Sequence, residues 1–164
     1  MKIYIGSDHA GYALKEKLKE YLSELGNEVE DKGPFAFDSN DDYPDFVRPV
    51  AEAVSRDLDS KGVVLGGGGQ GEAICANRVA GVRAMVFYGP RPANGIVDIA
   101  GRESIDSYEG VRLAREHNNA NIISIAARFV SDEEAKKALK LFLETNFYAE
   151  ERHVRRINKL EPNA

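Results

Sequence analysis

Short apolar runs alternate along the chain with longer segments in which apolar residues return every three or four positions. A short apolar run is typical of a strand buried in a parallel sheet, and the wider spacing is typical of an amphipathic helix. The pattern predicts strands at residues 2–5, 28–30, 62–65, 83–88 and 121–126. It predicts helices at residues 13–25, 43–59, 108–117, 132–146 and 150–160, and a further helix that opens after the glycine-rich stretch 66–71.

The alternation of strands and helices predicts an α/β fold, because helices supply the crossovers that parallel strands need. We expect a three-layer α/β/α sandwich whose five-stranded parallel sheet has the order 2-1-3-4-5. In that order the loops after the first and third strands meet where the strand order reverses, which is where such sheets bind ligands. Residues 1–164 are expected to form a single domain with a C-terminal helical arm at about 147–164.

The composition narrows the possible classes of function. A net charge of -5 and a pI near 5.3 argue against general binding of nucleic acid. The first residues do not resemble a secretory signal, and no apolar run approaches the roughly 20 residues of a membrane-spanning helix. The single cysteine, Cys75, allows no internal disulfide and fits a reducing compartment. We therefore expect a cytoplasmic protein that binds neither nucleic acid nor membranes.

The segment Gly66–Gly71, with the sequence GGGGQG, follows the third strand directly and opens into a helix. Glycines allow the backbone to approach a ligand closely, and several N–H groups pointing into one hollow stabilise an anion. The anion is either a phosphate or an enediolate oxygen that develops during proton transfer. The alternatives are a turn that only reverses the chain and a dinucleotide fingerprint, for which the position after the third strand is wrong.

Glu72, at the junction of this loop and the helix, is either a general base or a carboxylate stabilised by the helix dipole. Asp8 and His9 follow the first strand, and His117 with Asn118 ends a helix. These histidines can exchange protons with the oxygens of a sugar. Neither histidine has a carboxylate partner at a spacing typical of metal ligands, so we expect no metal.

Three arginines are candidates for binding phosphate. Arg128 follows the fifth strand, and Arg152 and Arg156 share one face of the last helix. The alternative is a solvated basic helix, but the arginine side chain binds phosphate through two parallel hydrogen bonds. We interpret the three as a phosphate clamp.

Taken in order, the motifs IGSDHAGYALKEKL, DYPDF, GGGGQGEAICANRVAGVRA, REHNNANIISIAAR and ERHVRRI resemble those of the ribose-5-phosphate isomerase B family, which includes allose-, galactose- and tetrose-phosphate isomerases. The resemblance covers nearly the whole chain. It implies a flavodoxin-like fold, no cofactor, and a dimer or dimer of dimers with the active-site cleft at the subunit interface. Many members have a cysteine where this chain has Gly66, and the resemblance is to the subgroup whose base is a glutamate.

The resemblance also implies the roles of individual residues. Those implied in catalysis are Glu72 as the base, His117 for opening the sugar ring, and Gly68 in the loop that stabilises the enediolate. Those implied in substrate binding are Asp8, His9, Tyr43, Gly67, Gly69, Gly71, Asn118, Arg128, Arg152 and Arg156. Two departures stand out: Gly68 replaces a usual serine or threonine, and residues 89–106 look like an insertion.

These residues together predict an aldose–ketose isomerase that converts ribose 5-phosphate to ribulose 5-phosphate through a cis-enediolate. One alternative is the same chemistry on a tetrose or hexose phosphate. Another is a subunit that binds a sugar phosphate without turning it over, and a third is a redox domain that binds a dinucleotide.

Overall fold

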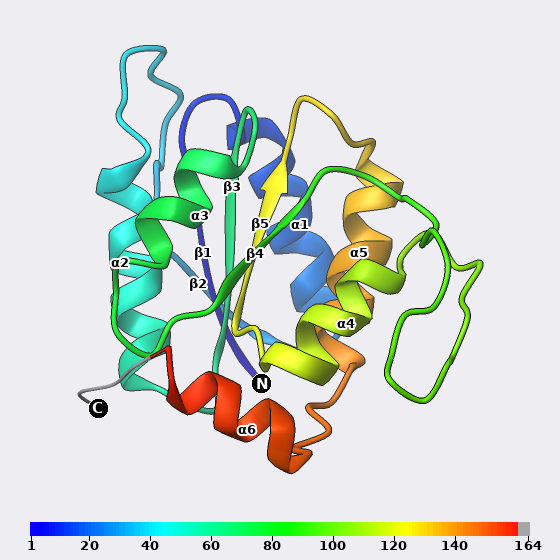
Figure 1. The fold of residues 1–164 in the computed structure, drawn as a ribbon. Coiled ribbons are helices and arrows are strands. Elements are labelled where there is room, and N and C mark those ends of the chain that lie inside the picture. The colour runs from blue at the N-terminus through cyan, green and yellow to red at the C-terminus, as the bar shows by residue number, and fades with distance from the viewer. Residues whose placement is uncertain (161–164) are drawn as a thin grey trace.

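The computed structural model describes residues 1–160, which form five strands and six helices. The strands are β1 (Lys2–Ser7), β2 (Glu28–Asp31), β3 (Lys61–Gly66), β4 (Ala84–Phe87) and β5 (Ile122–Ala126). The helices are α1 (Tyr12–Glu24), α2 (Pro44–Arg56), α3 (Gln70–Ala76), α4 (Glu109–Asn118), α5 (Asp132–Glu144) and α6 (Glu151–Asn158). Strands and helices alternate from β1 to α5, as the sequence predicts (Figure 1).

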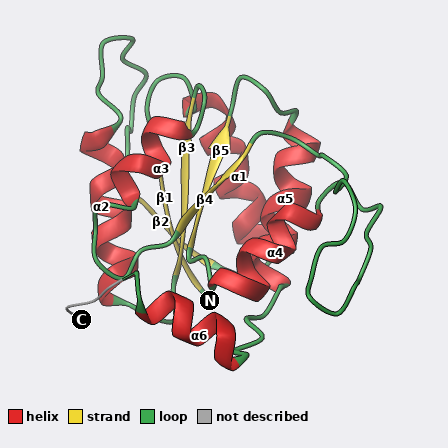
Figure 2. Ribbon diagram, viewed as in Figure 1, coloured by secondary structure: helices red, strands yellow, loops and turns green. Residues whose placement is uncertain are grey.

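The sheet is parallel throughout, and its order is β2-β1-β3-β5-β4. The α/β class and the five-stranded parallel sheet are confirmed, but the predicted order 2-1-3-4-5 is wrong for the last two strands. Every residue of β5 is buried, whereas three of the four residues of β4 are only partly buried. The strand that buries all its side chains takes the inner position, and β4 forms the edge (Figure 2). Because β1 and β3 still pair directly, the expected reversal point between them remains.

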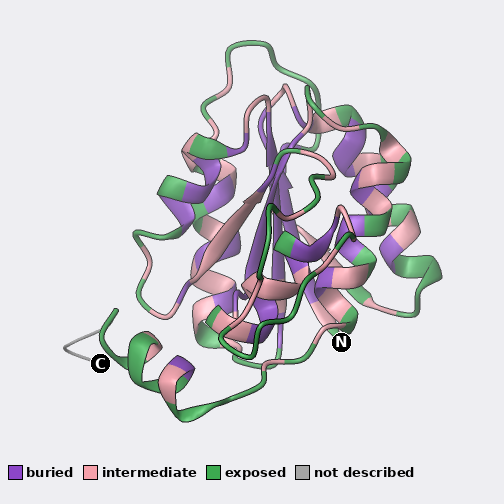
Figure 3. Ribbon diagram, turned by 45° about the vertical axis from the view of Figure 1, so that its right-hand side comes forward, coloured by how far each residue is buried: buried purple, intermediate pink, exposed green. Residues whose placement is uncertain are grey.

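Two apolar layers enclose the sheet. One lies under α1, α4 and α5 and includes Leu18, Val111 and Phe142. The other lies under α2 and α3 and includes Val50 and Ala76. Figure 3 shows the burial concentrated in the strands and in the inward faces of these helices. This arrangement is the predicted three-layer sandwich.

Two helix ends follow from local chemistry. Gly26, the predicted stop of the first helix, has a φ of +80°, which a residue with a side chain rarely adopts. At the start of α5 the Ser131 hydroxyl accepts the N–H of Glu134, and the Glu134 carboxylate accepts the N–H of Ser131 (2.8 Å). This reciprocal capping box fixes where α5 begins.

Residues 89–106 form a long loop beside α4 (Figure 1). The Arg91 N–H donates to the Ser107 carbonyl at the base of the loop. Arg102 ties the loop to α4 through Glu109 (2.7 Å) and Glu116 (3.2 Å), two carboxylates that are almost fully buried. The loop is therefore held along the helix that ends at His117.

The last helix, α6, lies across the end of the sheet opposite the glycine loop (Figure 1). It packs on α4, and just before it the Tyr148 hydroxyl donates to the Glu116 carboxylate (3.0 Å). Part of the predicted C-terminal arm, residues 161–164, lies outside the described residues. Within residues 1–160 no helix is long and apolar enough to cross a membrane.

Candidate active site

Three neighbouring strands deliver the polar residues of the site to one edge of the sheet. β1 ends at Ser7, just before Asp8 and His9, and β3 runs directly into the glycine loop. β5 ends two residues before Arg128. Since β1, β3 and β5 are parallel neighbours, their carboxyl ends lie side by side. The predicted meeting of these segments is what the fold produces.

The glycine loop, defined as Gly66–Gly71, is fixed by hydrogen bonds from β5 and the residues after it. The Ser124 hydroxyl donates to the Gly69 carbonyl (2.7 Å), and the N–H groups of Ala127 and Arg128 donate to the Gly66 and Gly67 carbonyls (2.9 and 3.2 Å). Gly69 has a φ of +70°, a conformation that favours glycine. These bonds make the loop a preorganised part of the sheet edge rather than a turn that only reverses the chain.

The Glu72 carboxylate occupies the space above the first glycine of this loop. Glu72 is 5% exposed, and a Cβ placed on Gly66 would lie 1.8 Å from its Oε1. Burial raises the pKa of Glu72, and the charge of Asp8 raises it further against the opposing N–H groups of Glu72 and Gly69. A carboxyl group with a raised pKa is suited to act as a general base near neutral pH. The protein itself supplies the desolvation that the helix dipole would otherwise outweigh.

Asp8 and His9 have different partners. The Asp8 carboxylate accepts the N–H groups of Ala10 and Gly11 (2.9 and 3.2 Å), which holds the turn after β1. His9 Nδ1 lies 2.7 Å from Asp41 Oδ1. Sequence reasoning missed Asp41 and gave His9 no carboxylate partner, because these residues are 32 positions apart and only the path of the loop before α2 joins them.

A metal ion could in principle use the same cluster. One ligand atom from each of Asp8, His9 and Asp41 lies within 4.8 Å of the others. Each of these side chains already serves the protein, however, since Asp8 caps its turn and Asp41 holds the His9 ring.

Two tyrosines and one arginine border the glycine loop. A Cβ on Gly71 would lie 3.0 Å from the Tyr43 ring, and one on Gly68 would lie 3.2 Å from the Tyr88 hydroxyl. The Arg128 guanidinium lies over Gly67 in the same way, at 3.2 Å. Tyr43 and Arg128 were predicted to be here. Tyr88 was not, and only its place directly after the fourth strand hinted at it.

The remaining predicted residues lie at the opposite edge of the sheet. α4 crosses from the glycine-loop edge to the far edge, where it ends with His117 and Asn118 before β5 begins. Arg152 and Arg156 are on α6, which lies at that far edge (Figure 1). One chain therefore separates the thirteen predicted site residues into a group of nine at the glycine loop and a group of four at the far edge.

The far group is itself organised. The rings of His117 and His153 stack with their centroids 4.3 Å apart and an interplanar angle of 13°. His153 is 2% exposed, and burial together with the neighbouring His117 lowers the pKa of His153. A neutral ring packed against His117 fixes the position of the latter on α4.

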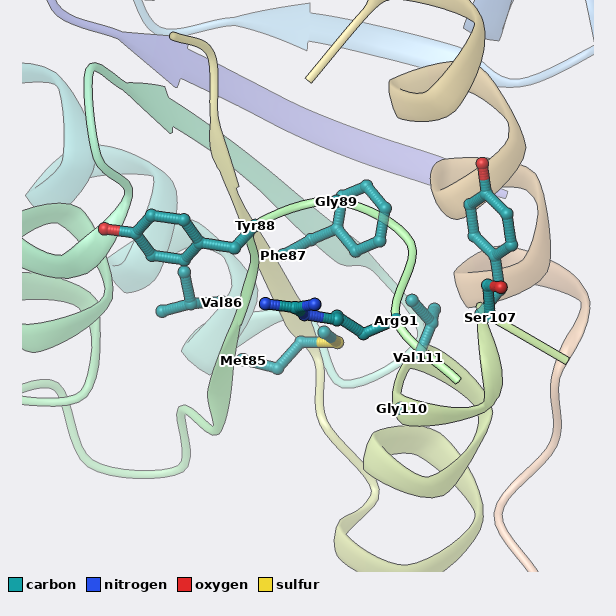
Figure 4. A pocket seen from close by; sticks show the side chains of 10 residues that line it. Met85, Val86, Phe87, Tyr88, Gly89, Arg91, Ser107, Gly110 and Val111 are labelled. Carbon is teal, nitrogen blue, oxygen red and sulfur yellow. The ribbon is translucent and has the colours of Figure 1, made fainter. Parts of the chain in front are cut away.

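A hollow of about 250 Å³ lies between β4 and the start of α4 (Figure 4). Its lining is Met85, Val86, Phe87, Tyr88, Gly89, Arg91, Ser107, Tyr108, Gly110 and Val111. Arg91 is its one charged lining residue, and no carboxylate or imidazole lines it. The hollow lacks the groups that proton transfer needs, so the candidate active site is the cluster at the glycine loop.

With this geometry described, known proteins give the family. The chain matches the Ribose/Galactose Isomerase family over residues 3–99 and 93–160. The chain belongs to the ribose/galactose isomerase family. The two matched segments of this family meet at residues 93–99, inside the loop 89–106.

Members of the family with known names and structures agree along the whole chain. Ribose-5-phosphate isomerase B of Mycolicibacterium paratuberculosis is 39% identical over 160 residues, which cover 98% of this chain and 89% of that protein. The crystal structure of ribose-5-phosphate isomerase B from Mycoplasma genitalium with bound ribulose-5-phosphate has a TM-score of 0.84 and 36% identity, and covers 99% of this chain and 97% of that chain. The enzyme from Thermotoga maritima gives a TM-score of 0.82 at 38% identity, with coverage of 98% and 97%. As a ribose/galactose isomerase, this chain is compared with relatives of nearly its own extent.

Proposed function

We propose that this protein is an aldose–ketose isomerase that converts ribose 5-phosphate to ribulose 5-phosphate. Membership of the ribose/galactose isomerase family supports the reaction class. The relatives named ribose-5-phosphate isomerase B, one of them with bound ribulose-5-phosphate, support the substrate. The single observation that carries the proposal is Glu72, a buried carboxyl group of raised pKa at the mouth of a fixed glycine loop.

Glu72 removes the proton from C2 of the open-chain aldose and returns it to C1. The electrons of the broken C–H bond form the C1–C2 double bond, and the negative charge moves to the carbonyl oxygen at C1. The glycine loop stabilises this cis-enediolate through its N–H groups. The hydroxyl proton on O2 passes to O1 through water, because Gly68 offers no hydroxyl group. No electron leaves the substrate, so the reaction requires no redox cofactor.

The active enzyme is a homodimer, or a dimer of dimers, with each site shared between two chains. His117, Asn118, Arg152 and Arg156 lie at the far edge from Glu72 in their own chain. A second copy packed in the antiparallel sense brings its far edge to the glycine loop of the first, as a two-fold interface requires of a self-complementary surface. In that arrangement His117 of one chain opens the sugar ring at the loop of the other.

The phosphate group binds to arginines from both chains. Arg128, exposed above Gly67, has no ion pair within residues 1–160 and is free to take the phosphate. Arg152 and Arg156 approach from the second copy and complete the clamp. Asp8, His9 and Tyr43 contact the sugar hydroxyl groups, and Gly67, Gly69 and Gly71 shape the loop around the reacting carbons.

We also assign residues 1–164 to a single domain and the protein to the cytoplasm. The buried thiol of Cys75 is free, which fits a reducing compartment. The acidic composition offers no basic surface for nucleic acid.

A substrate panel tests the proposal. Purified protein is incubated with ribose 5-phosphate, allose 6-phosphate, galactose 6-phosphate and erythrose 4-phosphate, with and without EDTA, and ketose formation is followed. We expect turnover of the pentose that EDTA leaves unchanged and that Glu72→Gln abolishes. Turnover of only another sugar would move the assignment within the family. Full activity of Glu72→Gln would contradict the assignment of the base.

A further inference from the structure

Asp41 holds the imidazole ring of His9 in one orientation. Its Oδ1 lies 2.7 Å from His9 Nδ1 and also accepts the backbone N–H of His9 (3.0 Å). The Asp41 side chain is 6% exposed, whereas that of His9 is 29% exposed. One carboxylate oxygen therefore fixes both the backbone and the ring of the same residue from the buried side.

We propose that Asp41 is a positioning residue for the sugar-phosphate reaction, acting through His9 alone. The inference rests on the proposed function. An ionised carboxylate only accepts hydrogen bonds, so the short contact requires the proton to be on Nδ1 of the ring. Nε2, which has no hydrogen bond within residues 1–160, then faces the ligand with a fixed chemical character: an acceptor in the neutral ring and a donor in the charged ring.

The carboxylate next in reach does not compete for this role. Asp8 lies close enough for its oxygen to be within 4.8 Å of the His9 and Asp41 ligand atoms. Its Oδ1, however, accepts the N–H groups of Ala10 and Gly11. The division of labour is clear from these bonds: Asp8 shapes the turn after β1, and Asp41 orients the ring.

The loop that carries Asp41 is anchored at its start. The Lys15 side chain is fully buried and donates to the Asp31 carboxylate (2.7 Å) and to the Pro34 carbonyl (2.8 Å). The Gly33 N–H donates to Asp31 (2.8 Å), and the Gly33 carbonyl accepts the N–H of Ser7 from β1. These bonds tie the loop between β2 and α2 to the strand that leads to His9.

Asp41 Oδ2 adds an observation that a purely structural role leaves unexplained. This oxygen is buried and has no hydrogen-bond partner within the described residues. A buried acceptor without a partner costs stability, so a residue selected only for stability would present an apolar or smaller side chain. The carboxylate is retained at a cost because its other oxygen sets the ring.

Two measurements test the proposal. The first is the ¹H–¹⁵N spectrum of the histidine ring nitrogens in ¹⁵N-labelled protein, with the His9 signals assigned by their loss in His9→Gln. We expect a protonated Nδ1 in the unmodified protein and loss of this tautomer in Asp41→Ala. An Nδ1 without its proton in the unmodified protein, or an unchanged tautomer in the variant, would overturn the proposal.

The second measurement is a double-mutant cycle on isomerase activity. Asp41→Ala is expected to lower kcat/KM by about 10- to 100-fold, the size of effect expected when a reacting group is misplaced by about 1 Å. In the His9→Ala background the same change should alter kcat/KM by no more than about 2-fold, because Asp41 then has no ring to orient. Asp41→Asn keeps an oxygen acceptor and should recover part of the loss. An equal loss in both backgrounds would show that Asp41 acts without His9.

The neighbouring aspartate supplies the matched control. Asp42 is exposed, and its side chain has no hydrogen bond or ion pair within residues 1–160. Asp42→Asn should therefore leave both the His9 tautomer and kcat/KM unchanged to within about 2-fold. A protein inactive on every sugar phosphate would refute the proposed function, and the tautomer measurement would still decide the role of Asp41.

Discussion

At the scale of single residues, Gly66 and Glu72 compete for one volume. The Glu72 carboxylate lies where any side chain at position 66 would begin, 1.8 Å from the ideal Cβ. A glutamate base and a side chain at position 66 therefore exclude each other in this arrangement. This gives a physical reason for a glycine where many relatives are expected to have a cysteine.

Gly66→Ala tests this exclusion. We expect the variant to fold, because the clashing atoms are the far end of a flexible side chain that can turn away. The displaced carboxylate can no longer reach the substrate, so kcat should fall by about 100-fold or more, the usual contribution of a general base. Activity and urea denaturation are measured together. The matched control is Gly110→Ala, since a Cβ there meets nothing within 4 Å; unchanged activity in Gly66→Ala would refute the exclusion.

The raised pKa of Glu72 predicts a pH dependence of both activity and stability. The base acts only when ionised, so the acid limb of the kcat/KM profile should lie above pH 4.5, the ordinary value for a glutamate. Because the folded state binds the proton more tightly than the unfolded state, the free energy of unfolding falls as pH rises from the unfolded to the folded pKa.

The stability part has a direct comparison. Glu72→Gln cannot ionise, so its stability relative to the unmodified protein should increase between about pH 4 and pH 8 while its activity is lost. Urea denaturation of the two proteins across this range measures the difference. A constant difference in the free energy of unfolding would mean that Glu72 titrates at its ordinary pKa.

Residues of the site were predictable where the chemistry is local in sequence. The glycine loop and Glu72 follow one strand without interruption, and Asp8 with His9 follows another. Asp41 and Tyr88 were missed because their relevance depends on contacts made through the folded path of the chain. A local pattern reports a turn and a charge, but not which distant side chain meets them.

At the scale of elements, the order of β4 and β5 exceeded what the sequence could tell. Both strands are short apolar runs, AMVF and IISIA, so hydrophobicity gives them equal claims to an inner position. The difference appears only in the fold, where β5 pairs with β3 on one side and β4 on the other. The edge position leaves the side chains of β4 only partly covered.

The same substitution on two strands measures this difference. Val64 on β3 is fully buried, and Val86 on β4 is only partly buried. Val64→Ala should lower the free energy of unfolding by about 2 kcal/mol, from the lost methyl groups and the cavity left behind. Val86→Ala should cost less than half as much, because part of its surface is already exposed. Equal losses in urea denaturation would contradict the edge position of β4.

At the scale of the whole molecule, the three-layer sandwich was predictable because alternating strand and helix patterns allow few other architectures. The separation of the site residues between two edges was not. Sequence places His117 and Glu72 on elements of the same domain, and only the direction in which α4 crosses the sheet shows that its end is far from the glycine loop. The shared site between two chains reconciles this distance with a single chemistry.

Subunit mixing tests the shared site. Glu72→Gln and His117→Ala should each be inactive or nearly so as pure proteins. If each site takes Glu72 from one chain and His117 from the other, a mixed dimer has one site with neither defect and one with both. Random exchange makes half of the dimers mixed, so about a quarter of the original activity should return.

The control for this experiment keeps both defects on the same side of the interface. Glu72→Gln mixed with Gly66→Ala gives dimers in which each site still has one damaged glycine loop, so no activity should return. Recovery in the first mixture and none in the second requires that His117 reach the glycine loop of another chain. No recovery in the first mixture, with subunit exchange verified by mass, would place the whole site in one chain and leave the stacked His117 and His153 rings with a structural role only.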